Sequence, residues 1–234
     1  MVSKSALVTG GTKGIGRDVV RVLAQRGFRV TIADTDAEAG REASQEAREL
    51  GAPDSHFEAV DVTDFASLSR TFEGHARRFG GLDVVVVNAG VGGGASKGDW
   101  QKSGRTVIQV NLTAQIESIM LAKKHMKPGS VIAVVASSGA VYPMPVAPSY
   151  AASKAGALMF VRSIAPLLEK AKIKIFAFCP AYTKTDLVLR GMREDKVFRD
   201  HVMALTKGVL MSPASVARYA SHSLESLSPS THTD

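Results

Sequence analysis

The stretch Lys4-Ser5-Ala6-Leu7-Val8-Thr9-Gly10-Gly11-Thr12-Lys13-Gly14-Ile15-Gly16 decides the fold. A short apolar strand at 4–9 runs into a glycine-rich turn, and the apolar pattern of a helix follows at 19–23. Glycines let the backbone approach a pyrophosphate, and the helix N-terminus adds free N–H groups and a positive dipole end. Although the spacing is G-x-x-x-G-x-G and differs from G-x-G-x-x-G, its place between strand and helix predicts a dinucleotide-binding turn.

The rest of the chain alternates short β-branched runs with longer amphipathic stretches. This alternation predicts repeated βαβ units and an α/β fold whose doubly wound parallel sheet is covered on both faces. The further strands are expected at 28–34, 56–61, 82–88, 130–136 and 173–179. We expect one domain over 1–227 and a polar, disordered tail over 228–234.

Two helical segments are expected after the last strand. Apolar residues recur among many charges at 186–207, which predicts one or two amphipathic helices that could cover a pocket. Ser212-Pro213 supplies an N-cap and a proline at the first helical position for a helix through about Leu224.

Composition favours a soluble, cytoplasmic protein without a signal peptide or a transmembrane helix. The 234 residues are 45% hydrophobic, and charges or turn formers interrupt the apolar runs before about 18 residues. The single cysteine, Cys179, lies in an apolar run and is expected to be a small buried strand residue rather than a nucleophile or metal ligand.

The net charge of +7 raises the question of nucleic-acid binding. The basic residues occur in small groups, among them Lys170, Lys172 and Lys174, without interleaved aromatic residues. We therefore expect solvated helix faces and no nucleic-acid partner.

Acidic residues at the ends of two strands fit the two halves of an adenosine. Asp34 ends the second strand 18 residues after Gly16, where a carboxylate can bind ribose hydroxyls. Asp61-Val62, after the third strand, is placed beside an adenine. The structural alternative for either aspartate is a helix or turn cap.

Tyr150 and Lys154 are four residues apart, and in a helix this spacing stacks phenol and ammonium on one face. A positive neighbour favours phenolate, so the pair predicts a tyrosine of lowered pKa that can transfer a proton. Taken alone, the spacing more often describes an ordinary surface pair.

With these motifs in order, the chain resembles the classical short-chain dehydrogenase/reductases over nearly its whole length. The matching motifs are Thr9-Gly10-x-x-x-Gly14-Ile15-Gly16, Asp61-Val62, Asn88-Ala89-Gly90, Asn111, Ser137-Ser138, Tyr150-x-x-x-Lys154 and Pro180. The resemblance implies a Rossmann-type fold that binds NAD(H) or NADP(H) and oxidises alcohols or reduces carbonyls.

The resemblance also implies roles for single residues. Tyr150 is the general acid/base, Lys154 lowers its pKa and holds the nicotinamide ribose, and Asn111 anchors a proton-relaying water chain. Ser137, 13 residues before Tyr150, is chosen to polarise the substrate oxygen, with Ser138 as the alternative. The implied cofactor contacts are Gly10, Thr12, Lys13, Gly14, Ile15, Gly16, Asp34, Asp61, Val62, Asn88, Ala89, Gly90, Tyr150, Lys154, Pro180, Thr183 and Thr185. No metal is implied.

The chain departs from the family pattern in three places. Pro180-Ala181 replaces Pro-Gly after the sixth strand, which could alter the backbone there. Val87-Asn88 replaces Asn-Asn. A seventh strand is not readable at 228–234, so the usual last strand is expected to be lacking or altered; the chain is then truncated, part of a longer polypeptide, or a shortened family member.

Two signals conflict on the cofactor. Asp34, with Asp36 close by, would repel a ribose 2′-phosphate, whereas in the family a basic residue at the position of Lys13 favours NADP. We give Asp34 the greater weight and expect NAD, with NADP as the alternative; Lys13 would then neutralise Asp34 or a phosphate.

The expected function is an NAD-dependent alcohol dehydrogenase or ketone reductase. The alternatives are an NADPH-dependent carbonyl reductase and a non-catalytic dinucleotide-binding or scaffold protein. The expected partner is a small, largely apolar alcohol or carbonyl compound, in a pocket bordered by Gly92-Gly93-Gly94, Tyr142-Pro143-Met144-Pro145 and 186–207. Apolar side chains on more than one face of the helices at 105–125 and 150–170 predict a homodimer.

Overall fold

The computed structural model describes the backbone of residues 3–93 and 100–225 and the side chains of residues 3–93 and 104–220. Gly94 and the predicted tail at 228–234 lie outside the described residues. In the described ranges one parallel sheet has the order β3-β2-β1-β4-β5-β6. Its strands are β1 (Ser5–Thr9), β2 (Arg29–Asp34), β3 (Ser55–Ala59), β4 (Leu82–Val87), β5 (Met126–Val135) and β6 (Lys174–Phe178). The predicted doubly wound α/β fold is confirmed.

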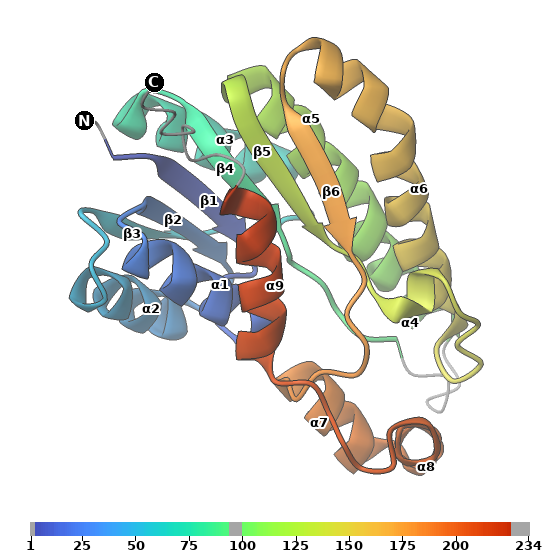
Figure 1. The fold of residues 1–234 in the computed structure, drawn as a ribbon. Coiled ribbons are helices and arrows are strands. Elements are labelled where there is room, and N and C mark those ends of the chain that lie inside the picture. The colour runs from blue at the N-terminus through green and yellow to red at the C-terminus, as the bar shows by residue number, and fades with distance from the viewer. Residues whose placement is uncertain (1–2, 94–99, 226–234) are drawn as a thin grey trace, which may run out of the picture.

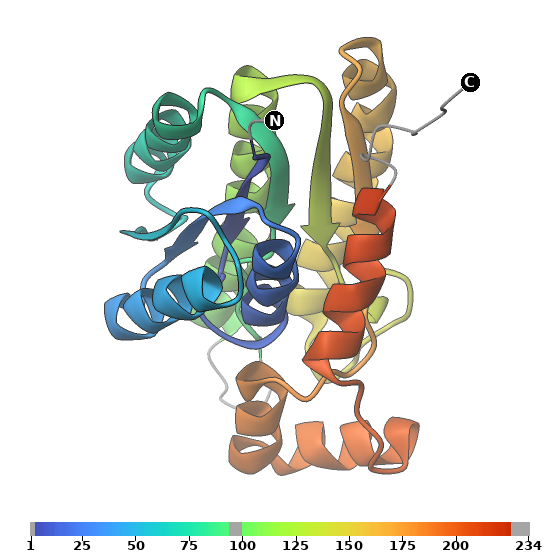
Figure 2. The ribbon, with the colours of Figure 1, turned by 60° about the vertical axis from the view of Figure 1, so that its left-hand side comes forward.

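Helices cover both faces of this sheet (Figures 1 and 2). One face carries α1 (Gly14–Gln25), α2 (Ala37–Glu49) and α9 (Pro213–Glu225), and the other carries α3 (Phe65–Phe79), α5 (Ala114–His125) and α6 (Pro148–Lys170). Side chains at alternate strand positions pack into two hydrophobic cores, one on each face of the sheet. Val8 packs into the core beneath α1, α2 and α9, and Leu7 packs into the core beneath α3, α5 and α6. Strands buried on both faces explain the nearly continuous apolar runs in the sequence.

Two strand boundaries differ from the sequence prediction by two residues or more. β3 ends at Ala59, two residues before Asp61. β5 begins at Met126, four residues before the expected start, and its register against β4 shifts between Leu82 and Val84. The register irregularity lies beside the Pro128-Gly129 pair of β5.

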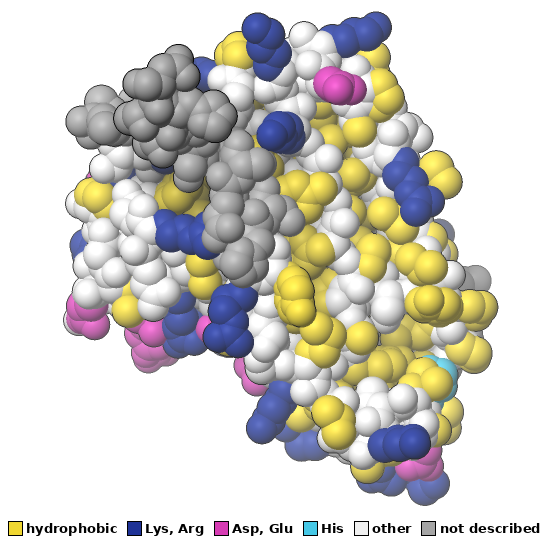
Figure 3. Space-filling model, viewed as in Figure 1, with side chains coloured by type: hydrophobic (Ala, Val, Ile, Leu, Met, Phe, Trp, Pro, Cys, Tyr) yellow, Lys and Arg dark blue, Asp and Glu magenta, His cyan; other side chains and the backbone are white. Residues whose placement is uncertain are grey.

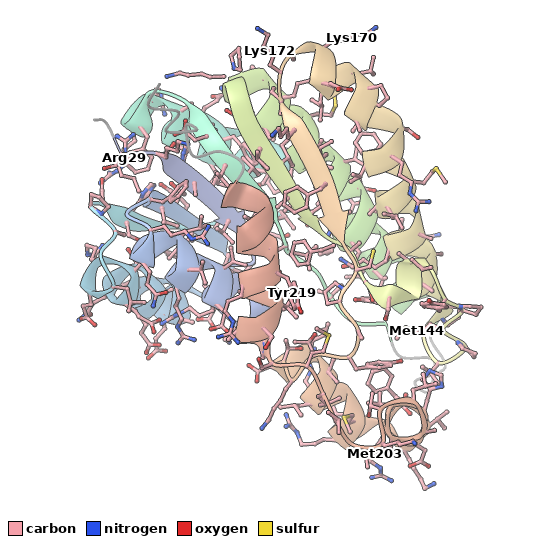
Figure 4. The ribbon with its side chains drawn as sticks, in the orientation of Figure 1. Arg29, Met144, Lys170, Lys172, Met203 and Tyr219 are labelled. Atoms are coloured by element: carbon pink, nitrogen blue, oxygen red, sulfur yellow. The ribbon has the colours of Figure 1, made fainter. Side chains whose placement is uncertain are left out.

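The predicted amphipathic helices are present as α7 (Asp186–Glu194) and α8 (Lys196–Thr206). Figure 1 shows them beyond the carboxyl ends of the strands, the edge at which ligands bind in open α/β sheets. In Figure 4, Met203 of α8 and Met144 lie at this end, whereas Lys170 and Lys172 project from the opposite end.

The predicted helix at 105–125 is divided into three parts. It begins as α4 (Trp100–Ile108), widens into a π-turn at Gln109–Thr113 and continues as α5. π-Turns interrupt the regular hydrogen-bond ladder and are frequent at functional sites. Asn111 lies in the middle of this one.

α6 has the length and mean hydropathy of a helix that could cross a membrane. It nevertheless carries buried Lys154 and packs Val161, Ile164 and Leu168 against the rest of the fold. These contacts place one face of α6 in the hydrophobic core.

Candidate active site

The glycine turn after β1 adopts the backbone that a phosphate cradle needs. Gly10 and Gly14 have φ of +66° and +54°, a left-handed conformation that side chains disfavour. A Cβ on Gly16 would overlap the backbone oxygen of Gly10. α1 begins at Gly14 and has no acidic residue in its first turn. The turn therefore fits an anionic group such as a dinucleotide pyrophosphate.

A second helix N-terminus faces this turn. Thr185 caps α7, with its Oγ1 accepting from Val188 N at 3.5 Å, and its Cγ2 would lie 3.1 Å from a Cβ on Gly14. The cleft alongside measures about 410 Å³, and its lining includes Lys13, Gly14, Lys184 and Thr185. Thr183 is buried and donates to Ala181 O at 2.9 Å.

Asn88 joins the loop after β4 to the glycine turn. Its Nδ2 donates to Thr9 O at 3.1 Å and to Gly10 O at 2.8 Å. The Oγ1 of Thr9 accepts from the backbone N–H groups of Asn88 and Ala89 at 3.0 and 3.2 Å. Asn88 and Ala89 therefore position the turn, and the relative placement of the two loops depends on their shared hydrogen bonds.

Asp34 stands at the end of β2 but is held by its own loop. Its Oδ2 accepts from Thr12 N at 3.1 Å and from Thr12 Oγ1 at 2.6 Å, and its Oδ1 accepts from Thr35 N at 2.8 Å. A carboxylate has about four acceptor positions, so Asp34 keeps capacity for a ribose hydroxyl.

Lys13 pairs with a different aspartate from the one expected. Its Nζ lies 2.7 Å from Asp36 Oδ2. The expected ion pair with Asp34 is therefore wrong, whereas neutralisation of a phosphate by Lys13 stays a prediction. The sequence analysis noted Asp36 as a neighbour of Asp34. Its pairing with Lys13 depends on how the N-termini of α1 and α2 lie beside each other.

Asp61 and Val62 follow β3 rather than ending it. Val62 is buried, while Asp61 is exposed and its Oδ1 accepts from Thr63 N at 2.9 Å and Thr63 Oγ1 at 2.8 Å. Asp64, not Asp61, caps α3. Asp61 therefore stabilises the turn that presents Val62.

The structure distinguishes the two candidate serines. The side chains of Ser137 and Tyr150 share a hydrogen bond. Ser138 instead binds through its backbone, as its N–H donates to Pro180 O at 2.8 Å and its oxygen accepts from Val141 and Tyr142. This geometry favours Ser137 as the hydroxyl that acts with Tyr150.

Lys154 lies behind the tyrosine in a buried position. Its Nζ donates to Val135 O at 2.9 Å and lies 5.9 Å from the centre of the Tyr150 ring. Burial lowers the pKa of Lys154 to about 8, opposed by the proximity of Cys179. A side chain on Gly90 would meet both Lys154 Nζ and Asn111 Oδ1. The absence of one leaves the space between these two side chains open.

The expectation of a lowered tyrosine pKa is wrong for the chain alone. Burial raises the pKa of Tyr150, and the hydrogen bond from Ser137 only partly opposes that shift. Desolvation disfavours the charged phenolate, and the ammonium is not in contact with the hydroxyl. Sequence spacing gave the shared helix face but could not give the degree of burial.

Asn111 is completely buried and clamps the loop after β4. Its Oδ1 accepts from Val91 N at 2.8 Å, and its Nδ2 donates to Val91 O at 2.9 Å and to Ser153 Oγ at 3.3 Å. Ser153 Oγ in turn donates to Tyr150 O at 2.7 Å. Ser153, which the sequence analysis missed, thus connects Asn111 to the helix turn that carries Tyr150.

Several predicted pocket segments converge in the described residues. A Cβ on Gly92 would lie 3.3 Å from Leu187 Cδ1, and a Cβ on Gly93 would lie 3.8 Å from Tyr150 Cβ. Gly92 and Gly93 therefore run between α7 and the tyrosine. Met144 Sδ would contact a Cβ on Gly139, beside Ser137. Figure 3 shows hydrophobic side chains gathered toward the α7–α8 end of the molecule.

Tyr182 is a further pocket residue that the sequence analysis missed. Burial and nearby Tyr150 both raise the pKa of Tyr182. Its ring meets those of Phe198 and His201 edge-on, with centroids 6.1 and 6.3 Å apart. Tyr182 therefore connects the tyrosine site to α8. Its place two residues after Pro180 was the available sequence signal.

The segment after β6 corrects two expectations. β6 ends at Phe178, and Cys179 is half-buried just beyond it, so the prediction of a buried strand cysteine is wrong. In the described part of the chain, Lys172 and Lys207 are the non-glycine residues with positive φ. Ala181 therefore needs no glycine-like backbone, and its replacement of glycine is tolerated here.

Comparison with known proteins agrees with the fold. Residues 4–195 match the family described as short chain dehydrogenase. Human 15-hydroxyprostaglandin dehydrogenase (NAD(+)) is 31% identical over 225 residues, which cover 90% of this chain and 82% of that protein. The 3-ketoacyl-(acyl-carrier-protein) reductase of Brucella melitensis, solved with NADH, has a TM-score of 0.82 at 25% identity, covering 98% of this chain and 95% of the other. An actinorhodin polyketide ketoreductase solved with NADPH has a TM-score of 0.84, also at 25% identity, covering 94% and 89%.

Proposed function

This chain belongs to the classical short-chain dehydrogenase/reductase family, and we propose that it transfers a hydride between NAD(H) and a secondary alcohol or ketone. The observation that carries the proposal is the hydrogen bond between Ser137 and Tyr150, with buried Lys154 behind the tyrosine ring. A protein that only binds a dinucleotide has no need of this arrangement.

In the oxidation direction, Tyr150 acts as the base that takes the proton of the substrate hydroxyl. Ser137 donates a hydrogen bond to the same substrate oxygen and stabilises the charge that develops there. The bound nicotinamide ring supplies the hydride acceptor for oxidation and the hydride donor for reduction. In the reduction direction Tyr150 returns a proton to the carbonyl oxygen.

Two buried residues support this exchange. Lys154 provides a positive charge that favours phenolate and a donor for the nicotinamide ribose. Asn111 holds Val91, which follows β4, and anchors the path by which protons leave Lys154 for solvent. Both roles follow the family assignment of these positions.

NAD(H) is the favoured cofactor, because Asp34 places a carboxylate at the end of β2 where a 2′-phosphate would bring a second negative charge. NADPH is the alternative, which the relatives allow because one solved neighbour carries NADH and another NADPH. The residues proposed to hold the nucleotide are the glycine turn, Asp34, Val62, Asn88-Ala89-Gly90, Thr183 and Thr185.

A largely apolar substrate fits the residues around Tyr150, which include Leu187, Met144 and Tyr182. The name of the human relative designates a hydroxyprostaglandin, a hydroxyl-bearing lipid. Long-chain secondary alcohols are therefore the first class to test, followed by small cyclic and aromatic ones.

A homodimer in the cytoplasm completes the proposal. Met120 of α5 and Met159 and Leu167 of α6 are 46%, 57% and 56% exposed, which leaves an apolar surface on the side of these helices away from the sheet. A two-fold pairing of the same helices would bury it.

The test is incubation of the purified protein with NAD⁺ and a panel of secondary alcohols, followed by the absorbance of NADH. Alcohol-dependent NADH formation supports the proposal. Nucleotide binding without turnover of the alcohols or of the matching ketones would favour a dinucleotide-binding scaffold instead.

A further inference from the structure

We propose that Asp36 determines cofactor preference by holding Lys13, so that this lysine is withheld from a ribose 2′-phosphate. The inference rests on the proposed function, because it concerns the nucleotide which that function uses. It assigns the discrimination against NADP to two carboxylates: Asp34 repels the phosphate, and Asp36 removes the cation that would attract it.

The pair lies where two helices begin. Lys13 is the N-cap residue of α1, between Thr12 and Gly14 of the phosphate-binding turn. Asp36 is the N-cap residue of α2, and its Oδ1 accepts from Ala39 N at 3.1 Å while its Oδ2 lies 2.7 Å from Lys13 Nζ. The capping bond fixes the carboxylate, so the lysine meets a positioned partner rather than a mobile one.

The electrostatic surroundings of Lys13 favour this pairing. The hydrogen bond that Lys13 donates to Asp36 raises the pKa of Lys13, and the charges of Asp36, Asp186 and Asp34 add attraction in that order. The same bond lowers the pKa of Asp36. A 2′-phosphate would have to compete with Asp36 for the Lys13 ammonium.

The neighbouring arginine of the turn is also engaged. Arg17 Nε lies 2.6 Å from Glu46 Oε2, and its Nη1 donates to Ala39 O at 3.1 Å. Arg21 Nε binds the other oxygen of Glu46 at 2.8 Å. Lys13, Arg17 and Arg21 near the start of α1 therefore all pair with carboxylates of α2 or its N-cap. Lys13 differs from the two arginines because its single ion pair, with Asp36, is exposed.

The experiment measures binding of NADH and NADPH by their intrinsic fluorescence, without added substrate, to the wild type, Asp36→Asn, Lys13→Met and the double variant. Asparagine also caps helices, so Asp36→Asn removes the charge while keeping the start of α2. We expect it to raise affinity for NADPH relative to NADH by about five-fold, the scale of an exposed ion pair. In the Lys13→Met background, Asp36→Asn should raise the affinity for NADPH relative to NADH by less than about two-fold. Without the lysine, Asp36 acts only through its solvent-screened repulsion of the 2′-phosphate.

Asp54→Asn is the matched control, since it breaks the Arg78–Asp54 pair of 2.8 Å at the opposite ends of the strands. It should leave the NADPH-to-NADH ratio unchanged. An unchanged ratio in Asp36→Asn, or an equal gain with and without Lys13, would overturn the inference. Failure of every variant and the wild type to bind either nucleotide would instead contradict the proposed function.

Discussion

The Nζ of Lys154 lies 5.9 Å from the centre of the Tyr150 ring and donates to the backbone oxygen of Val135. The lysine is therefore held by β5 rather than by the tyrosine. Burial shifts both pKa values toward the uncharged forms, raising that of Tyr150 and lowering that of Lys154 to about 8. The chain alone thus keeps a tyrosine that is poised as a proton donor, and base catalysis requires further stabilisation of phenolate in the assembled complex.

Asn111→Ala should destabilise the protein as well as slow it. The substitution leaves the N–H and oxygen of Val91 without the side-chain partners that now lie at 2.8 and 2.9 Å. An unsatisfied buried group costs about 1–3 kcal/mol, and Val91 is half-buried, so the free energy of unfolding should fall by about 1 kcal/mol in urea titrations. A variant as stable as the wild type would show that the clamp on Val91 is not structurally important.

Asp34→Ala should weaken NADH binding and relatively favour NADPH, because it removes both a ribose acceptor and a repulsive charge. It also deprives Thr12 of its 2.6 Å acceptor, so the glycine turn should loosen for both nucleotides. Fluorescence titration with NADH and NADPH measures both effects. An unchanged preference would contradict the role given to Asp34.

His75 should make stability depend on pH. Burial, with help from His56 and Arg29, lowers its pKa to about 3, while the unfolded chain titrates near 6.5. Between these values the unfolded state binds more protons, so stability rises with pH across that window and falls as pH drops below 6.5. From pH 7 to pH 5 the contribution is roughly 2 kcal/mol.

His75→Gln should remove most of that pH dependence, because glutamine does not titrate. Its side chain can still bond to Thr31 Oγ1, which lies 2.7 Å from His75 Nδ1. Urea unfolding of both proteins at pH 7 and pH 5 gives the comparison. An equal loss of stability in the variant would assign the pH dependence to other groups.

Light scattering at micromolar concentration should give the mass of a dimer. Leu167→Glu places a charge on the exposed face of α6 and should shift the mass toward a monomer. Leu205→Glu, at a leucine 66% exposed on α8, is the matched control and should remain dimeric. A monomeric wild type would refute helix pairing, and a tetramer would show that a further interface exists.

Sequence reasoning identified the elements of this site because their signals are local. The turn at 9–16 combines a strand, glycines and a helix start, and the Tyr150–Lys154 spacing defines a helix face whatever surrounds it. Ser137 could be favoured over Ser138 only by family spacing. Its choice is now supported because a Cβ on Gly139 would lie 3.5 Å from Ser137 Oγ and 3.8 Å from Tyr150 Cδ1, so the two side chains share one space.

Features that depend on distant segments were not readable. The Lys13–Asp36 pair needs the relative placement of α1 and α2, and the contact of Tyr182 with α8 needs the return of the chain past β6. The tyrosine pKa was mispredicted for the same reason, since burial is a property of the packed fold. Cys179 was misplaced by one residue at a strand end, where apolar patterning does not mark the boundary.

Replacement of Tyr150 by phenylalanine tests the central claim most directly. It removes only a hydroxyl, so folding and NADH binding should persist while turnover of an accepted alcohol falls by about 10²-fold or more. Tyr219→Phe, at a tyrosine 72% exposed on α9, controls for the chemical change and should keep wild-type turnover. Near-normal turnover by folded Tyr150→Phe would contradict the assignment of this tyrosine as the proton-transferring group.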